Sequence, residues 1–140
     1  MDADLPSATD AGQDRRPLVL IIDDDPAMRD SLAAVIEAFG FRTHTAVNGL
    51  EGLEAVATVA PAAIITDIHM PDMDGLELLT ALRNASTGIP VIAISGGVAK
   101  GFDFLSAARK MGAVAAFQKP LPVFEMIDTI SRLMTRGVAA

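Results

Sequence analysis

Three consecutive carboxylates, Asp23, Asp24 and Asp25, directly follow an apolar run that ends at Ile22. Two unit charges about 4 Å apart repel by roughly 4 kcal/mol at an effective dielectric constant of 20, so clustered acids need either water or a positive group around them. Asp25 precedes Pro26 and an amphipathic stretch, which is typical of a helix N-cap followed by proline at the first helical position. Asp23 and Asp24 are therefore the candidates for chemistry here.

A third carboxylate, Asp67, ends a second apolar run that starts at Ala63. Asp23 and Asp24 alone fit a solvated loop as well as a metal site, but a third acid beside them favours metal binding. Clustered carboxylates are driven towards protonation unless a hard cation lies between them, and Mg²⁺ suits few carboxylates, bound waters and a phosphate oxygen. A carboxylate beside Mg²⁺ can attack phosphorus, and Asp67 is the best candidate because Asp23 and Asp24 form a pair suited to the ion.

A hydroxyl and an ammonium group close two further apolar runs, at Ser95 and Lys119. An ammonium group near Asp67 would neutralise charge on phosphoryl oxygens in a transition state, and a hydroxyl would donate a hydrogen bond to the bound phosphoryl group. Each residue alone also fits an ordinary surface lysine or a strand-end serine. The hypothesis therefore depends on the elements that bring these side chains together.

The apolar runs alternate with amphipathic stretches along the chain, which predicts an α/β fold with a parallel sheet. Four runs are apolar on both faces, as covered strands are, and a fifth alternates with polar residues like an edge strand. For five strands the common doubly wound order is 2-1-3-4-5, with a ligand crevice past the carboxyl ends of strands 1 and 3. The four covered strands are Leu18–Ile22, Ala63–Ile65, Val91–Ile94 and Ala113–Phe117, and the edge strand is Phe41–Thr45.

Helical periodicity predicts which side chains of the intervening stretches face the sheet. The first helix should end at Gly40, and the second should begin with a capping box formed by Asn48 and Glu51. The predicted inner faces are Met28, Leu32, Val35, Ile36 and Phe39 in the first helix, and Leu50, Leu53, Val56 and Ala57 in the second.

The composition fits one globular domain and excludes several functional classes. The 140 residues are 51% hydrophobic and carry a net charge of −7, which argues against binding nucleic-acid phosphates. There are no cysteines for disulfides or thiolate metal sites. No apolar run approaches the roughly 20 residues of a spanning helix, and the polar start is unlike a secretory signal. We expect a cytoplasmic protein without membrane insertion, with a disordered leader (1–17), one domain (18–136) and a short tail (137–140).

Four motifs at the ends of these runs resemble the response-regulator receiver domain over roughly Leu18 to Met134. The resemblance implies a flavodoxin-like receiver fold and a phosphoacceptor in two-component signalling. Two positions depart from the common pattern, because Gly96 stands where alanine is frequent and Phe117 where tyrosine is frequent. The motifs, in chain order, are Ile21–Pro26, Asp67–Gly75, Val91–Ser95 and Phe117–Pro120.

The resemblance also implies a role for each matching residue. Asp67 would accept a phosphoryl group from a phosphohistidine of a sensor histidine kinase or a histidine phosphotransfer protein. The backbone carbonyl of His69 would join the three carboxylates around Mg²⁺. Ser95 would bind a phosphoryl oxygen and move towards it, and Phe117 would rotate inward as the aromatic switch residue. Lys119 would pair with the phosphoryl group, next to a cis Lys119–Pro120 bond.

The partners implied by the resemblance are proteins. We expect no output domain after the last helix, so the signal would pass to a separate downstream protein, with a homodimer on phosphorylation as a further option. The domain could instead drain phosphoryl groups from a shared kinase. The resemblance also allows self-catalysed phosphorylation from small donors and self-catalysed dephosphorylation.

Two other functions remain open from the sequence alone. A phosphatase of the haloacid-dehalogenase type would use Asp23 as its nucleophile, because Asp23 and Asp25 form an Asp-x-Asp motif after the first strand. Pro26 stands where that family usually has Thr or Val, and the chain is short for its core and cap. A binding module on a receiver scaffold would need no phosphorylation at all.

Overall fold

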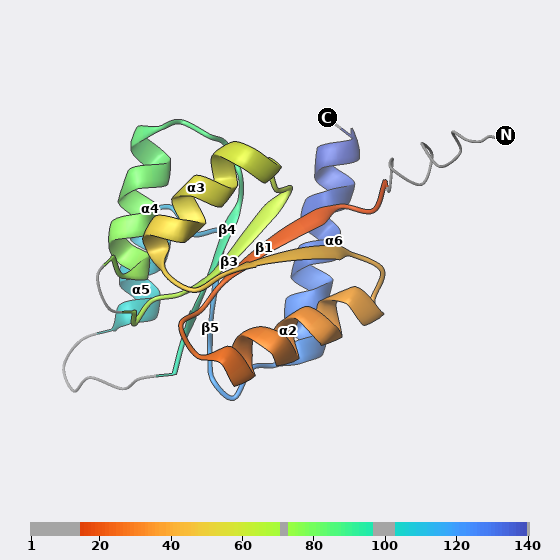
Figure 1. Cartoon of the computed structure of the whole chain (residues 1–140), viewed down its shortest axis with the longest axis horizontal. Helices are drawn as coiled ribbons and strands as arrows, with labels where there is room; N and C mark the ends of the chain where they lie inside the picture. The colour runs from red at the N-terminus through yellow and green to blue at the C-terminus, as the bar shows by residue number, and fades with distance from the viewer. Residues whose placement is uncertain (1–14, 71–72, 97–102, 140) are drawn as a thin grey trace, which may run out of the picture.

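The protein is described by a computed structural model of residues 15–70, 73–96 and 103–139, with side chains described up to residue 134. Most of the predicted leader lies outside the described residues, and the domain boundaries at 17 and 136 stay predictions. Strands and helices alternate along the described chain (Figure 1). They are β1 (Leu18–Ile22), α2 (Pro26–Ala38), β2 (Arg42–Ala46), α3 (Gly49–Val59), β3 (Ala63–Asp67), α4 (Gly75–Asn84), β4 (Val91–Ser95), α5 (Phe104–Lys110), β5 (Ala115–Gln118) and α6 (Val123–Ala139).

The strands form one parallel sheet in the order β2-β1-β3-β4-β5, which confirms the predicted doubly wound fold. Ile22 is in register with Thr66, and Asp67 is in register with Ile94. Because the strands are parallel, the residues that follow β1, β3 and β4 emerge at the same edge of the sheet. This register places the carboxyl ends of strands that are distant in the sequence next to one another.

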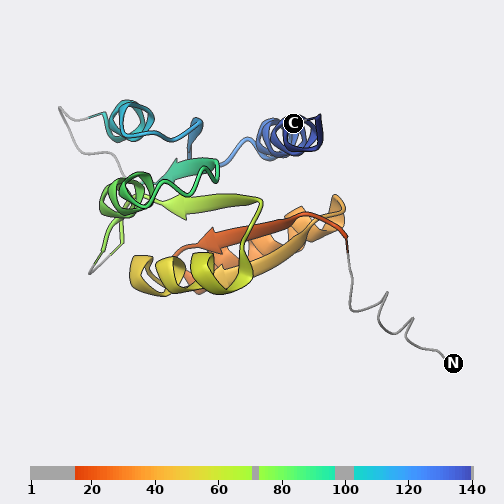
Figure 2. The same ribbon diagram turned by 90° about the horizontal axis from the view of Figure 1, so that it is seen from above.

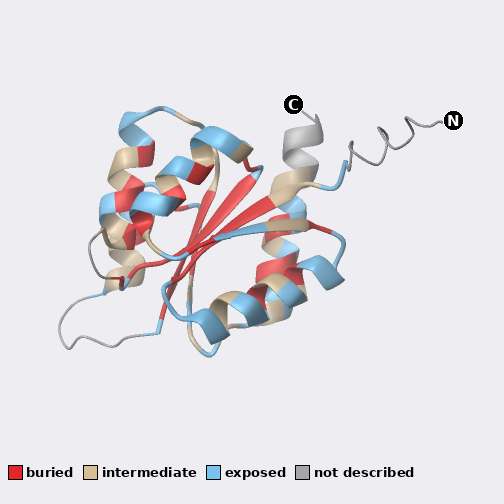
Figure 3. Ribbon diagram, in the orientation of Figure 1, coloured by how far each residue is buried: buried red, intermediate tan, exposed pale blue. Residues whose placement is uncertain are grey.

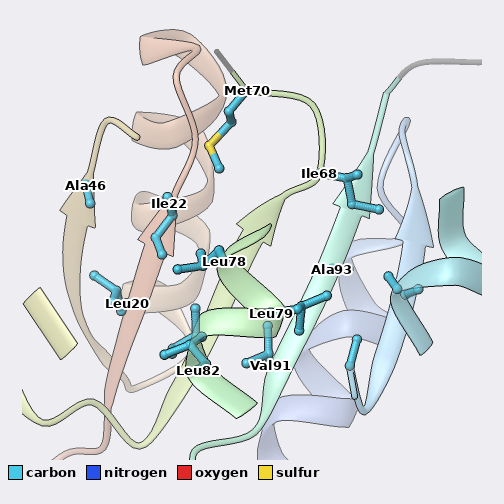
Figure 4. Packing of buried hydrophobic residues seen from close by; sticks show 14 of the residues in the cluster. Leu20, Ile22, Ala46, Ile68, Met70, Leu78, Leu79, Leu82, Val91 and Ala93 are labelled. Carbon is cyan, nitrogen blue, oxygen red and sulfur yellow. The ribbon is translucent and has the colours of Figure 1, made fainter. Parts of the chain in front are cut away.

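Helices cover both faces of the sheet, with α3, α4 and α5 on one side and α2 and α6 on the other (Figure 2). Leu20 of β1 belongs to the cluster that includes Leu78 of α4 (Figure 4), whereas its neighbour Ile21 belongs to the cluster that includes Ile36 of α2. Figure 3 shows the central strands as the most deeply buried elements. A fully buried Leu or Ile stabilises the fold by about 2 kcal/mol, so both faces fix the sheet.

The helix starts follow the predicted capping chemistry. The Asp25 side chain accepts a hydrogen bond from the Ala27 backbone N–H, with Pro26 in the first turn. Asn48 caps α3, but the Glu51 carboxylate accepts from the Val47 N–H rather than from that of the cap residue. The capping box predicted at Asn48 is therefore only half formed.

The predicted inner face of α3 is partly wrong. Leu50 is 55% exposed and Ala57 is also exposed, whereas Gly49 and Gly52 are buried. A Cβ atom on Gly52 would lie 2.5 Å from Ile22 Cδ1, so this helix packs on the sheet through its glycines. The periodicity of large hydrophobic residues could not find a face made of glycine.

Two further burial predictions are corrected by the structure. Phe39 is 48% exposed at the end of α2, where its ring packs edge-to-face on Phe124. The last strand begins at Ala115, and Ala116 is its only buried residue, because β5 is an edge strand. In the described part of the chain, no helix has the length and apolar character needed to cross a membrane.

Candidate functional site

Three carboxylates meet at the carboxyl edge of the sheet, as the strand order predicted. Asp23 and Asp24 follow β1, and Asp67 is the last residue of β3. One oxygen of each lies within 4.8 Å of the others. Asp23 is fully buried and Asp67 is 5% exposed, whereas Asp24 is open to solvent. The site therefore has two buried carboxylates and one exposed carboxylate at its opening.

Lys119 supplies the positive charge of this cluster from the end of β5. Its Nζ atom lies 3.3 Å from Asp67 Oδ2 and 3.5 Å from Asp23 Oδ2. Its backbone N–H donates to the Ser95 carbonyl at 2.8 Å, which fixes where the side chain starts. Burial lowers the pKa of the Lys119 ammonium group, but attraction to the two carboxylates outweighs this effect and leaves the pKa raised. Lys119 is therefore a cation at neutral pH.

The surroundings of Asp23 disfavour its charged form. Burial raises the pKa of Asp23, the charge on Asp67 raises it further, and the Asp25 N–H and Lys119 only partly offset these effects. Among described residues, Asp23 Oδ2 is a buried polar atom without a hydrogen bond. An oxygen with spare lone pairs beside two other carboxylates fits a hard divalent cation such as Mg²⁺.

Backbone and side-chain donors hold the two buried acids in place. Asp23 Oδ1 accepts from the Asp25 N–H at 2.9 Å, and Asp67 Oδ1 accepts from the His69 N–H at 3.0 Å. Arg29, one turn into α2, donates from Nη1 to the Asp23 carbonyl at 2.9 Å. The sequence analysis missed Arg29. Its position one turn after the N-cap Asp25 was the available signal, since the first turn of a helix lies beside its cap.

The hydroxyl and the switch candidate occupy adjacent places on β4 and β5. Ser95 ends β4 and is 2% exposed, with Oγ 3.1 Å from Nε2 of His69. Phe117 is half-buried on β5, in register with Ile94, the residue before Ser95. The Lys119–Pro120 bond is cis, as the resemblance implied.

Two glycines make room for the site, and sequence reasoning gave neither this role. A Cβ atom on Gly75 would lie 2.5 Å from the Asp67 carbonyl oxygen, so α4 starts directly against the backbone of the candidate acceptor. A Cβ atom on Gly96 would lie 2.8 Å from Lys119 Cδ. The small residue after Ser95 therefore accommodates the lysine stem.

Comparisons with known proteins agree on one family. The model for the response regulator receiver domain matches residues 19–131. The chain is 34% identical over 120 residues to the transcriptional regulatory protein PrrA of Mycobacterium tuberculosis, which covers 86% of the chain and 51% of PrrA. It is 31% identical over 117 residues to the sporulation initiation phosphotransferase F of Bacillus subtilis, which covers 83% of the chain and 92% of that protein.

Solved structures give the same answer. The receiver domain of the Francisella response regulator 1452 matches with a TM-score of 0.80 and 30% identity over 87% of this chain and 99% of that domain. The chain belongs to the response regulator receiver family, whose members are signalling phosphoacceptors. Neither alternative, the phosphatase or the phosphorylation-independent module, is favoured by these relatives. The chain spans about half the length of the first curated relatives that it matches.

Proposed function

We propose that Asp67 is the residue that accepts the phosphoryl group in this receiver domain. The observation that carries the proposal is a buried carboxylate at the end of β3 with an ammonium group 3.3 Å from its Oδ2 atom and two further acids beside it. Asp23, Asp24, Asp67 and the backbone carbonyl of His69 would hold Mg²⁺. When bound, the ion would neutralise the oxygens of the phosphoryl group during transfer.

Asp67 acts as the nucleophile in the proposed reaction. One of its carboxylate oxygens forms a bond to phosphorus while the bond from phosphorus to the donor nitrogen breaks. The electron pair of that bond stays on the donor ring, which takes up a proton from water and leaves as a neutral imidazole. The product is an acyl phosphate on Asp67, and attack by water on its phosphorus atom releases inorganic phosphate and regenerates the carboxylate.

Lys119 and Ser95 stabilise the transferred group. Lys119 pairs with Asp67 before transfer, so its ammonium group is already within reach of oxygens that arrive on that carboxylate. The Ser95 hydroxyl donates to a phosphoryl oxygen as the group settles. Phe117 lies beside Ile94 on the neighbouring strand, and we expect its ring to turn inward when Ser95 moves.

The proposed donor is a phosphohistidine on a sensor histidine kinase or a histidine phosphotransfer protein, and the proposed target is a separate protein that binds the switched surface. Because such donors are made from ATP, the proposal places the protein in the cytoplasm. Dimerisation of the phosphorylated form stays a prediction, which sedimentation of the labelled protein would test.

The experiment is labelling by acetyl phosphate with Mg²⁺, followed by intact-mass spectrometry. We expect a gain of ~80 Da, one phosphoryl unit, in the wild type and none in Asp67→Asn. Asp128→Asn is the matched control, since Asp128 is an exposed carboxylate of α6 that pairs with Arg132 on the same helix. Equal labelling of Asp67→Asn, or a labelled peptide that contains Asp23, would refute the assignment.

A further inference from the structure

His69 contacts three parts of the site at once. Its backbone N–H donates to Asp67 Oδ1, its ring nitrogen Nε2 lies 3.1 Å from Ser95 Oγ, and its ring packs edge-to-face on Phe104 with centroids 4.4 Å apart. The residue itself is exposed, so burial does not dictate how its ring lies. The contacts with Ser95 and Phe104 therefore define a specific orientation of the ring.

The hydroxyl of Ser95 is the group over which His69 and a phosphoryl group would compete. Ser95 is 2% exposed, so its hydrogen bonds depend on protein groups. A serine hydroxyl has one proton to donate, and phosphoryl oxygens can only accept. In the neutral tautomer of His69 with its proton on Nδ1, Nε2 accepts the proton of the hydroxyl, so Ser95 cannot donate to a phosphoryl group on Asp67 without giving up His69.

Phe104 holds the His69 ring where this competition occurs. It is the first residue of α5, and its side chain is half-buried against the hydrophobic core. An edge-to-face pair of rings favours one relative orientation. A turn of the His69 ring away from Ser95 would break its contact with Phe104 at the start of α5, which links the hydroxyl to this helix.

We propose that His69 is a positioning residue that binds the Ser95 hydroxyl in the unphosphorylated protein and competes for it with the phosphoryl group. Phe104 keeps the His69 ring in the competing orientation. This inference rests on the proposed function, because it concerns the response to a group on Asp67. Its consequence is that the His69 side chain lowers the affinity of the site for a phosphoryl group.

The test is the affinity for beryllofluoride, a noncovalent phosphoryl mimic, measured with Mg²⁺ by following backbone amide resonances. His69→Phe keeps an aromatic ring against Phe104 and removes Nε2. We expect it to bind the mimic about fivefold more tightly, the factor for one neutral hydrogen bond. His69→Ala should shift affinity in the same direction, and His44→Phe, on the edge strand β2, should leave it unchanged.

The decisive comparison repeats His69→Phe in a Ser95→Ala protein, where the substitution should no longer change the affinity. Unchanged affinity in His69→Phe, or the same gain without the serine hydroxyl, would overturn the inference. If His69→Phe changes the rates of binding and release by the same factor, the affinity stays constant. That result would mean that the His69 ring only shields the site, and it would also contradict the inference. Failure of the wild type to bind the mimic and to be labelled by acetyl phosphate would instead refute the proposed function.

Discussion

Backbone groups pair across the strands at both edges of the sheet, but the two edges differ in the charge that they bury. At the amino edge, backbone groups pair across the strands, as in the bonds from the Ala62 N–H to the Leu18 carbonyl and from the Ile64 N–H to the Pro90 carbonyl. At the carboxyl edge, Asp23 keeps a buried oxygen that has no hydrogen bond among described residues. The amino edge is built for stability, whereas the carboxyl edge keeps a destabilising charge that a bound cation would relieve.

The largest effect should come from the core near the amino edge. Ile64 is fully buried between β1 and β4, so Ile64→Ala should lower the free energy of unfolding by about 4 kcal/mol through lost burial and a cavity. Urea unfolding measures this loss, and the fraction that stays folded should still accept a phosphoryl group. Val114→Ala, at a 51% exposed residue, is the control and should cost less than ~0.5 kcal/mol. Equal losses of unfolding free energy in Ile64→Ala and Val114→Ala would contradict the view that the amino edge stabilises the fold.

Gly75→Ala should disturb both stability and chemistry, because the added methyl group meets the backbone of Asp67. Overpacking of this kind costs about 2 kcal/mol, and labelling by acetyl phosphate should slow as the acceptor shifts. Gly52→Ala is the comparison, since its methyl group meets the buried Ile22 side chain and no atom of Asp67, so it should lower stability without slowing labelling to the same extent. A Gly75→Ala protein that unfolds and labels like the wild type would contradict the close approach.

Asp23→Asn should stabilise the metal-free protein by about 1 kcal/mol, since it removes a buried charge beside Asp67 and keeps the bond from the Asp25 N–H. The same change should abolish the stabilisation that added Mg²⁺ gives the wild type. Thermal unfolding with and without Mg²⁺ measures both effects, and Asp30→Asn on the exposed side of α2 is the control. Loss of stability in Asp23→Asn would show that Asp23 is a net stabilising charge.

The pH dependence has a definite sign. Because burial raises the pKa of Asp23 above its unfolded value of 3.8, the folded state holds this proton more tightly than the unfolded state. Stability from Asp23 therefore falls as pH rises from 3.8 through the raised pKa. The gap between Asp23→Asn and the wild type should close at pH below 3.8, in urea titrations without metal. A gap that stays constant with pH would contradict the raised pKa.

The smallest effect should come from Gly96→Ala. Its methyl group would press on the stem of Lys119 without touching the core, so stability should hardly change. We expect labelling to slow about twofold, because a displaced ammonium group stabilises the transferred group less well. Ser106→Ala, within α5, is the control for a small change outside the site. Faster labelling in Gly96→Ala would show that the glycine costs activity.

The sequence predicts the scaffold of the site well, because strand ends and parallel order are set by apolar runs. Asp23, Asp67, Ser95 and Lys119 each follow such a run, and the order of the strands brings them to one edge. Helix caps were also predictable, since they depend on neighbours along the chain, as at Asp25 and Pro26 at the start of α2.

Contacts between distant segments could not be predicted where no hydrophobic periodicity in the sequence indicates them. The bond from Arg29 to the Asp23 carbonyl and the approach of Gly75 to Asp67 depend on where loops place backbone atoms. The contact of His69 with Ser95 joins residues that are 26 positions apart, and a loop histidine gives no hint of its partner. Exposure of Leu50 was missed because the glycines of α3, rather than its leucine, set the packing distance.

The hydrogen bond from the Lys119 backbone N–H to the Ser95 carbonyl joins the hydroxyl-bearing and the cation-bearing segments at their last shared rung. A displacement of one main chain at this point strains or breaks this bond to the other. We therefore expect that a partner protein bound to the outer side of β5 would affect Lys119 and Ser95 together. Such a partner would change the proposed phosphoryl site without entering it.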